Sequence, residues 1–360
     1  MEILNFVELS VVLIFTFLNE SNVETSKASF RSFEKYYPDN SINRFFGLIS
    51  ADTESIAAYL MGLERQYTPR ADHQLFELSP LRRFPLLKNG EQYRPYSKRL
   101  LYISLQHWVY DFLRDYNAQW FVNEFGHVFE RYVGRLIRHL GLPFLTEKQI
   151  ELALKGKRKR LIDFIILDGG SKIFVDAKGV EMSYLGQVSD NPDDIQRGTD
   201  SSIIKGIKQG CSVANSIQRI TMIDGIGLPT ENENYLIVVT YKELYIGNGR
   251  VFRDLLGESV MVQLQTCDGF HLIPMEHMYF MSIDEFEIFV QAVHEKKIGF
   301  LECLRRVIAV DSAWNTRKLI FSQHLEGKLW PDGIPKFLND EFIEILTRLQ
   351  RRYAAKPDLG

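Results

Sequence analysis

The chain has 360 residues, of which 45% are hydrophobic and 25% are charged, and its formal net charge is −3. This composition is ordinary for a globular protein, and the length is enough for two or three domains. The chain has neither a Walker loop nor a G-x-G-x-x-G motif, which argues against ATP hydrolysis. Three scattered cysteines and eight histidines without ligand spacing argue against disulfides and structural zinc, and favour a cytoplasmic setting.

Residues 1–115 are expected to form an N-terminal α/β region. The apolar run from Val11 to Leu18 predicts a buried strand, because its eight residues are too few for a membrane span, which needs about 20. No membrane association is therefore expected. Residues 52–66 predict a helix and residues 81–88 a loop. Frequent aromatic and arginine side chains in this region are compatible with binding of substrate or of a protein partner, and the sequence leaves both open.

Residues 119–140 predict an amphipathic helix, because apolar side chains recur along it at helical spacing. Gly141 and Pro143 then end the helix, as a glycine followed by a proline often does. Glu130 lies beside the apolar stripe, with Gly126 and Gly134 one turn to either side. These small neighbours would let another element approach Glu130 closely. An ordinary solvated glutamate is the alternative interpretation.

Basic residues are concentrated around the end of this helix. Between His127 and Ile162 there are nine lysines or arginines against three glutamates, a local net charge of +6. Such a patch neutralises phosphates in a sequence-independent, salt-sensitive way. A soluble loop or a nuclear import signal would have a similar composition. We expect nucleic acid to contact Arg131, Arg135, Lys155, Lys157, Arg158, Lys159 and Arg160.

Residues 160–180 predict a β-hairpin. Two apolar runs flank the pair Gly169-Gly170, which is a strong signal for a two-residue turn. With this pair at the tip, the numbers of opposed residues add up to 339, so Asp163 lies opposite Asp176. Opposed side chains share a face of the hairpin, with Cβ atoms roughly 4.5–5.5 Å apart. Lys178 follows two residues after Asp176 and therefore projects from the same face.

Two carboxylates held this close repel each other, and a divalent cation relieves the repulsion. Carboxylate oxygens suit Mg²⁺ or Mn²⁺, which usually keep waters and also bind substrate phosphates. A lysine beside such a site is well placed to orient or deprotonate a water that attacks a phosphodiester. A plain salt bridge between aspartate and lysine is the alternative interpretation.

The residues Asp163 and Asp176-Ala177-Lys178 resemble the PD-(D/E)xK signature of nucleases with the restriction-endonuclease-like fold. Ile162 stands where the signature has proline, and the second acid is aspartate instead of the commoner glutamate. The resemblance implies that Asp163, Asp176 and the carbonyl group of Ala177 bind the metal, and that Lys178 serves the attacking water. It also implies that Glu130, on the preceding helix, completes the metal site.

The sequence after the hairpin predicts three further segments. Residues 181–200 are polar and predict a long loop, either a flap over the substrate or a disordered insertion. Residues 201–219 predict a helix with Lys205, Lys208 and Gln209 on or near one side, where the resemblance implies contact with nucleic acid and an exposed polar face is the alternative interpretation. Residues 235–241 form a continuous apolar run that is typical of a central strand.

We therefore expect an α/β fold in three parts. Residues 1–115 form the N-terminal region, and residues 116–265 form a restriction-endonuclease-like core, an α-β-β-β-α-β mixed sheet flanked by helices. Residues 266–360 form a C-terminal, mostly helical region. The N-terminal or the C-terminal region would serve oligomerisation or the binding of a partner protein.

The expected function is that of a Mg²⁺- or Mn²⁺-dependent nuclease, and DNA is favoured over RNA as its substrate. The resemblance alone suggests a role in bacterial restriction or phage defence. A catalytically weak nucleic-acid-binding subunit of a larger nuclease or ATPase complex is the alternative function, and a purely structural protein is a third.

Overall fold

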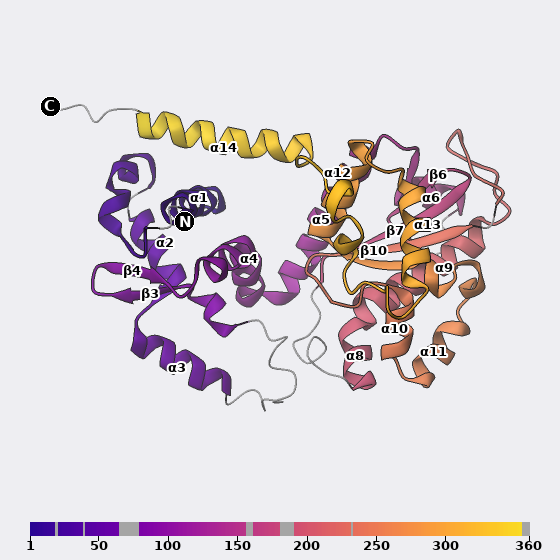
Figure 1. The fold of residues 1–360 in the computed structure, drawn as a ribbon, viewed down its shortest axis with the longest axis horizontal. Helices are drawn as coiled ribbons and strands as arrows, with labels where there is room; N and C mark the ends of the chain where they lie inside the picture. The colour runs from indigo at the N-terminus through magenta and orange to yellow at the C-terminus, as the bar shows by residue number, and fades with distance from the viewer. Residues whose placement is uncertain are drawn as a thin grey trace. The chain divides into compact units, whose positions relative to one another are not determined.

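The computed structural model describes residues 1–18, 21–38, 40–64, 79–155, 161–180, 191–231 and 233–354 (Figure 1). The chain divides into two compact units. The first contains Met1–Phe121 together with Phe337–Gly360, and the second contains Val122–Lys336. This division differs from the expected three parts, because the last helix belongs with the N-terminal region and residues 266–336 belong with the expected core.

The first unit combines helices with a small sheet. The four strands lie in the order β1-β4-β3-β2, and β3 and β4 form a hairpin around Gly90, whose φ is 61°. The strands are β1 (Thr25–Ser26), β2 (Ser50–Ala51), β3 (Leu86–Asn89) and β4 (Gln92–Pro95). The α-helices are α1 (Ile3–Leu18), α2 (Ser41–Ile49), α3 (Thr53–Glu64), α4 (Lys98–Tyr116) and α14 (Lys336–Ala354), and the 3₁₀ segments are η1 (Lys27–Tyr36) and η3 (Pro80–Arg83).

The expected strand from Val11 to Leu18 is wrong, because these residues form the second half of α1. The apolar run is part of a 16-residue helix whose Leu9, Leu13 and Phe17 are fully buried at helical spacing. The helix in residues 52–66 is confirmed as α3. Residues 81–88, expected as a loop, contain the end of η3 and most of β3. None of the helices in the described ranges is long and apolar enough to cross a membrane.

The C-terminal helix belongs to the first unit because a buried carboxylate on α1 is paired with it. Glu8 has no exposed surface and forms ion pairs with Arg348 and Arg352 of α14. The hydroxyl group of Tyr37 donates a hydrogen bond of 3.0 Å to the same carboxylate. A buried charge is costly unless it is paired and hydrogen-bonded. These contacts therefore hold α14 against α1.

The second unit is built on a mixed five-stranded sheet in the order β11-β10-β7-β6-β5. Strand β6 runs antiparallel to both of its neighbours, whereas β7, β10 and β11 are parallel to one another. The strands are β5 (Phe144–Thr146), β6 (Phe164–Asp168), β7 (Ser171–Lys178), β10 (Asn234–Thr240) and β11 (Met278–Ser282), and a separate two-stranded ribbon contains β8 (Met222–Ile223) and β9 (Ile226–Gly227).

The hairpin of β6 and β7 has the predicted turn and the predicted register. Phe164 pairs with Val175 and Asp168 with Ser171, so the sum of 339 is confirmed along the whole ladder. Gly169 and Gly170 have φ values of 53° and 86°, which two-residue turns of this kind require. The ladder begins at Phe164, so Asp163 lies one residue before it, at the open end of the hairpin.

Helices cover both faces of this sheet, as the expected α/β architecture requires. On one face Gly134 of α5 (Ala118–Leu140) lies close enough to Phe164 that an added Cβ would be 3.0 Å from its ring. On the other face α9 (Lys205–Ile217) packs on Val238 and Leu236 through Gly206 and Gly210. The apolar side chains on that face, such as Ile165 and Phe174, belong to one buried cluster with those of α9.

The remaining helices of the second unit include one that was not expected. Half of the polar segment 181–200 is helical, because α8 (Pro192–Thr199) starts with proline and with Asn191 as its cap. The other half, residues 181–190, lies outside the described residues. A π-helical turn, η4 (Asp200–Ile204), joins α8 to α9. The others are α6 (Glu147–Ala153), α10 (Gly249–Leu255), α11 (Glu258–Gln265), α12 (Ile283–His294) and α13 (Phe300–Asp311).

Candidate metal centre

The open end of the β6–β7 hairpin gathers the charged residues that the sequence singled out. Asp163 lies just before β6, and its Oδ2 accepts a hydrogen bond of 2.7 Å from the peptide N–H of Ala177. Asp176 and Lys178 lie at the end of β7 and project from the face that α9 covers. The hairpin register thus brings together residues that are 13 to 15 positions apart in the sequence.

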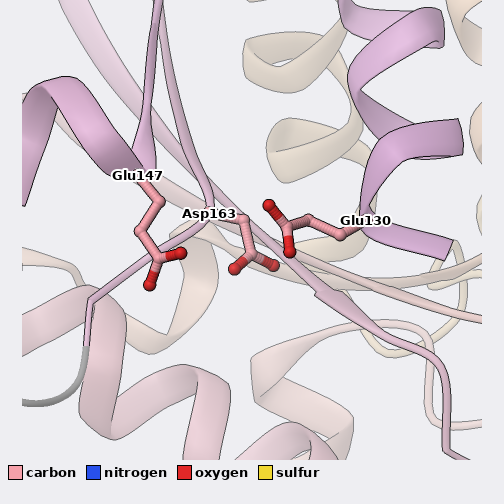
Figure 2. Close-up of side chains that lie close together, drawn as sticks. All are labelled: Glu130, Glu147 and Asp163. Carbon is pink, nitrogen blue, oxygen red and sulfur yellow. The ribbon is translucent and has the colours of Figure 1, made fainter. Parts of the chain in front are cut away.

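Glu130 and Glu147 join Asp163 to form a group of three carboxylates, here called the acidic cluster. One oxygen from each of the three side chains lies within 4.8 Å of the others. Figure 2 shows them converging from α5, from the start of α6 and from the segment before β6, with Asp163 in the middle. The structure therefore places Glu130 where the sequence predicted it, beside Asp163. Asp176 is not a member of this group as these distances define it.

Asp176 is fully buried, and its negative charge is only partly compensated. Lys178 Nζ lies 2.6 Å from Asp176 Oδ2. Neither oxygen of Asp176, however, accepts a hydrogen bond of acceptable geometry from the part of the chain that the structure describes. Buried carboxylates normally accept several hydrogen bonds. The environment of Asp176 therefore leaves room for a further positive ligand.

Helix α9 approaches Asp176 closely because Gly206 has no side chain. A Cβ atom at this position would lie 2.9 Å from Asp176 Oδ2 and 2.7 Å from Val238 Cγ2. Real Cβ atoms essentially never make contacts under 3.0 Å. The glycine thus buries Asp176 under the helix, and this burial excludes water from one side of the carboxylate.

Gln209 fixes the position of Lys178. Its Oε1 accepts a hydrogen bond of 2.9 Å from Lys178 Nζ, and its Nε2 donates to the carbonyl oxygen of Leu161. Lys178 is therefore held between Asp176 and the side chain of Gln209. The sequence predicted that Gln209 contacts nucleic acid, but both ends of its amide group are engaged within the protein. Gln209 is better described as a residue that positions Lys178.

Two carboxyl groups at this end of the hairpin have raised pKa values. Burial, and then the charge of Asp176, raise the pKa of Asp163 well above its usual range. Partial desolvation, and then the charges of Glu130, Glu151 and Asp176, raise the pKa of Glu147. Glu147 keeps contact with solvent, which screens these charges and makes its shift the weaker of the two. Burial is the larger cause of both shifts, and the neighbouring carboxylates add to it.

Glu147 is the member of the acidic cluster that sequence reasoning missed. It is the first residue of α6, directly after β5, and a capping box of Thr146 and Gln149 fixes that helix start. The signal was present as a Thr-x-x-Gln pattern behind a short apolar run. Such a pattern places an acidic residue at the edge of a sheet, but it does not say which other residues meet it there.

The basic residues that the sequence assigned to nucleic acid lie in three places. Arg131 and Arg135 are exposed on α5, immediately after Glu130 and one turn further on. Lys155 is exposed just after α6, while Lys157, Arg158, Lys159 and Arg160 lie outside the described residues. Lys205 and Lys208 line a pocket of about 390 Å³ together with Asp200, Ser201, Gln209 and Ser212.

The donor set fits a hard divalent cation. All the candidate side chains offer carboxylate oxygens, the ligands that Mg²⁺ and Mn²⁺ prefer, and no histidine or cysteine takes part in the described acidic cluster. Asp176 adds a buried carboxylate without hydrogen bonds from described residues. The carbonyl group of Ala177 stays a predicted ligand, since its strand position is known and its N–H is already bonded to Asp163.

Comparisons of the chain with protein-family models, with curated proteins and with solved structures gave no match. An assignment of function therefore depends on the geometry of the acidic cluster and on the motif in the sequence.

Proposed function

We propose that this chain is a metal-dependent nuclease that hydrolyses phosphodiester bonds, with DNA as its first candidate substrate. One observation carries the proposal above all others. The carboxylates of Glu130, Glu147 and Asp163 converge at the open end of the β6–β7 hairpin. The buried pair of Asp176 and Lys178 lies at the same end, on β7. Such an excess of negative charge is costly in a folded protein unless it binds a cation.

The arrangement of the sheet supports the resemblance to the restriction-endonuclease-like fold. When α6, α8, η4 and the β8–β9 ribbon are set aside as insertions, the order α5, β5, β6, β7, α9 and β10 follows the α-β-β-β-α-β pattern that the resemblance implies. Strand β6 is antiparallel to its neighbours and β10 is parallel to β7. In this proposal Asp163 and Asp176 stand at the ends of adjacent strands, where the PD-(D/E)xK signature has its two acids.

The proposed mechanism gives each residue a separate task. Asp163, Asp176, Glu130 and Glu147 would hold Mg²⁺ or Mn²⁺, which when bound supplies a Lewis acid for the phosphoryl oxygen and acidifies water. The N–H of Ala177 orients the carboxylate of Asp163. Lys178, positioned by Gln209, would hold the attacking water through Nζ. The exposed Arg131, Arg135 and Lys155 would contact the substrate backbone.

A cleavage assay tests the proposal directly. We expect the purified protein to cut at least one of supercoiled plasmid, linear duplex, single strands or RNA when Mg²⁺ or Mn²⁺ is present, and none with chelator. Asp176→Asn should reduce the rate by at least about 100-fold, because it removes a ligand charge at nearly constant volume. Asp168→Asn, the same change at the other end of the hairpin, is the matched control and should keep the activity.

The alternative function is a catalytically weak nucleic-acid-binding subunit, and the third possibility is a structural protein in which the Lys178–Asp176 contact is a plain salt bridge. Titration calorimetry with Mn²⁺ separates these possibilities. Cation binding that is lost in Asp163→Asn, without cleavage of any substrate, would favour the subunit. Absence of cation binding would overturn the metal centre and favour a structural salt bridge. A role in restriction or phage defence is proposed on the resemblance alone.

A further inference from the structure

The pocket on α9 has the chemistry of an anion site. It has a volume of about 390 Å³ and lies along one side of α9 and of the π-helical turn before it. Its lining is polar, with Lys205 and Lys208 as cations and Ser201 and Ser212 as hydroxyl groups. Among the described residues of the lining Asp200 is the only acidic one, so their net charge is positive.

The two lysines of the pocket are available for a ligand. In the described ranges neither Lys205 nor Lys208 has an ion-pair or hydrogen-bond partner, although Asp200 lines the same pocket. Ammonium and hydroxyl groups together offer several donors to one multi-oxygen acceptor. A phosphate group fits this set, because it combines negative charge with several strong acceptor oxygens. An apolar ligand does not fit, since it would desolvate both ammonium groups without replacing their hydrogen bonds.

The pocket adjoins the candidate metal centre through one side chain. Gln209 lines the pocket, and its Oε1 accepts a hydrogen bond of 2.9 Å from Lys178 Nζ. Lys178 in turn lies 2.6 Å from Asp176. The side chain of Gln209 therefore links the pocket to the Asp176–Lys178 pair. Oε1 of that amide accepts from Lys178 and Nε2 donates to the carbonyl oxygen of Leu161, so Gln209 is held in place as part of the pocket wall.

We propose that this pocket binds a phosphate group of the substrate strand, next to the phosphate that meets the acidic cluster. The inference rests on the proposed function and adds a second phosphate contact to it. Lys205 and Lys208 neutralise the phosphate, and Ser201 and Ser212 donate hydrogen bonds. The same chemistry serves an internal phosphodiester of a continuous strand and a phosphomonoester at a strand end, and these two sources are separated by the test below.

The test measures binding without cleavage. Thymidine oligomers of equal length, carrying a 5′-phosphate, a 3′-phosphate or no terminal phosphate, are titrated against the full chain by fluorescence anisotropy in chelator. We expect the double substitution Lys205→Gln, Lys208→Gln to weaken binding by about 10-fold or more. It should also flatten the dependence of log Kd on log salt by about 0.7, since one phosphate contact on a single strand contributes about that much.

A matched control separates local contact from overall charge. Lys328→Gln, Lys336→Gln removes the same two charges at exposed positions that do not line the pocket. This control should bind within about a factor of 2 of the wild type, well below the tenfold change that about 1.4 kcal/mol represents. Equal losses in both double variants, or no loss in either, would overturn the phosphate pocket.

The arms of the experiment also identify the source of the phosphate. A gain in affinity from a terminal phosphate that disappears in the Lys205/Lys208 variant assigns the pocket to strand ends. Equal affinity for all three oligomers, with the same loss in that variant, assigns it to an internal phosphodiester. If the pocket variant loses binding while the wild type cleaves nothing, the pocket stands and the nuclease proposal fails. If cleavage requires Asp176 and the pocket variant binds normally, the nuclease proposal stands and the phosphate pocket fails.

Discussion

The two ends of the β6–β7 hairpin contain similar charged residues but compensate their charges differently. At the tip, Lys172 is buried and donates 2.8 Å hydrogen bonds to two carbonyl oxygens, those of Pro229 and Glu231. Asp168 accepts a 2.8 Å hydrogen bond from the N–H of Leu301. At the open end, Lys178 is equally buried, but Asp163 and Asp176 lie among further carboxylates and raise one another's energy.

This comparison shows how charged residues with a structural role differ from charged residues of a candidate site within one hairpin. At the tip, Lys172 and Asp168 are satisfied by peptide groups, which are fixed and neutral, and Glu233 is paired with Arg305. The open end collects several charges of one sign and leaves Asp176 without hydrogen bonds from described residues. A folded chain holds such an arrangement only at a cost in stability. A cation would offset this cost, so substitutions at the two ends should differ in how much they change the stability and in how that change responds to Mn²⁺ and to pH.

The largest expected difference in stability between the ends comes from their two buried lysines. Lys172→Met should destabilise the protein by about 1–3 kcal/mol, because it leaves buried carbonyl groups without donors. Lys178→Met should cost about 3–5 kcal/mol in chelator, because it leaves the buried charge of Asp176 unpaired. Urea denaturation measures both. Mn²⁺ should restore part of the stability of Lys178→Met but not of Lys172→Met.

The lysine comparison would fail in either of two ways. If Lys178→Met destabilises the protein no more than Lys172→Met does in chelator, the buried carboxylate of Asp176 does not depend on a cation. Equal effects of Mn²⁺ on both variants would show that the added ion acts elsewhere in the protein.

A smaller effect is expected from the helix that buries Asp176. Gly206→Ala places a methyl group against Val238 and Asp176, so we expect a loss of about 1–3 kcal/mol by overpacking together with slower cleavage. Gly47→Ala in α2 is the matched control, because nothing lies within 4 Å of its added Cβ. The control should gain about 0.5–1 kcal/mol from helix propensity. A stable, fully active Gly206→Ala would show that α9 does not confine Asp176.

The sequence was sufficient for the parts of the fold that depend on local signals. The Gly-Gly pair predicted the β6–β7 turn and its register, and the apolar runs predicted α5 and β10. The strand expected for residues 11–18 was wrong, because an eight-residue apolar run has no periodicity of its own that separates a strand from a buried helix. The start of α8 was missed because its proline and acidic residues resembled a loop.

The site residues also divide into those that local sequence signals predict and those that depend on contacts between distant segments. Asp163, Asp176 and Lys178 lie on one hairpin, so strand register alone places them together. Glu130 was reached from helix periodicity and from the resemblance, whereas Glu147 depends on how β5 pairs with β6, a contact of distant segments. The hydrogen bonds of Gln209 could not be predicted for a similar reason, since nothing near it in the sequence shows that Leu161 and Lys178 bind its amide group.

The smallest predicted effect, and the one that compares the two ends most directly, is the response to pH in chelator. The pKa of Asp163 is raised by burial and by Asp176, so the folded state binds its proton more tightly than the unfolded chain does. Its contribution to the stability therefore rises as the pH falls from the raised pKa towards the ordinary carboxyl value of about 4. At the tip, the hydrogen bond from Arg305 lowers the pKa of Glu233 to about 2. The contribution of Glu233 is present above about pH 4.5 and is lost as the pH falls towards 2.

Opposite changes should follow when the two groups are made neutral. Relative to the wild type, Asp163→Asn should be more stable at pH 7, and this advantage should shrink by pH 5. Glu233→Gln should be less stable at pH 7, with a deficit that stays constant down to pH 5 and shrinks only below about pH 4.5. Midpoints of urea denaturation at pH 7, 5 and 3.5 measure both differences. Parallel pH profiles for the wild type and Asp163→Asn between pH 7 and 5 would mean that the open end carries no uncompensated charge, and the contrast between the two ends would then be lost.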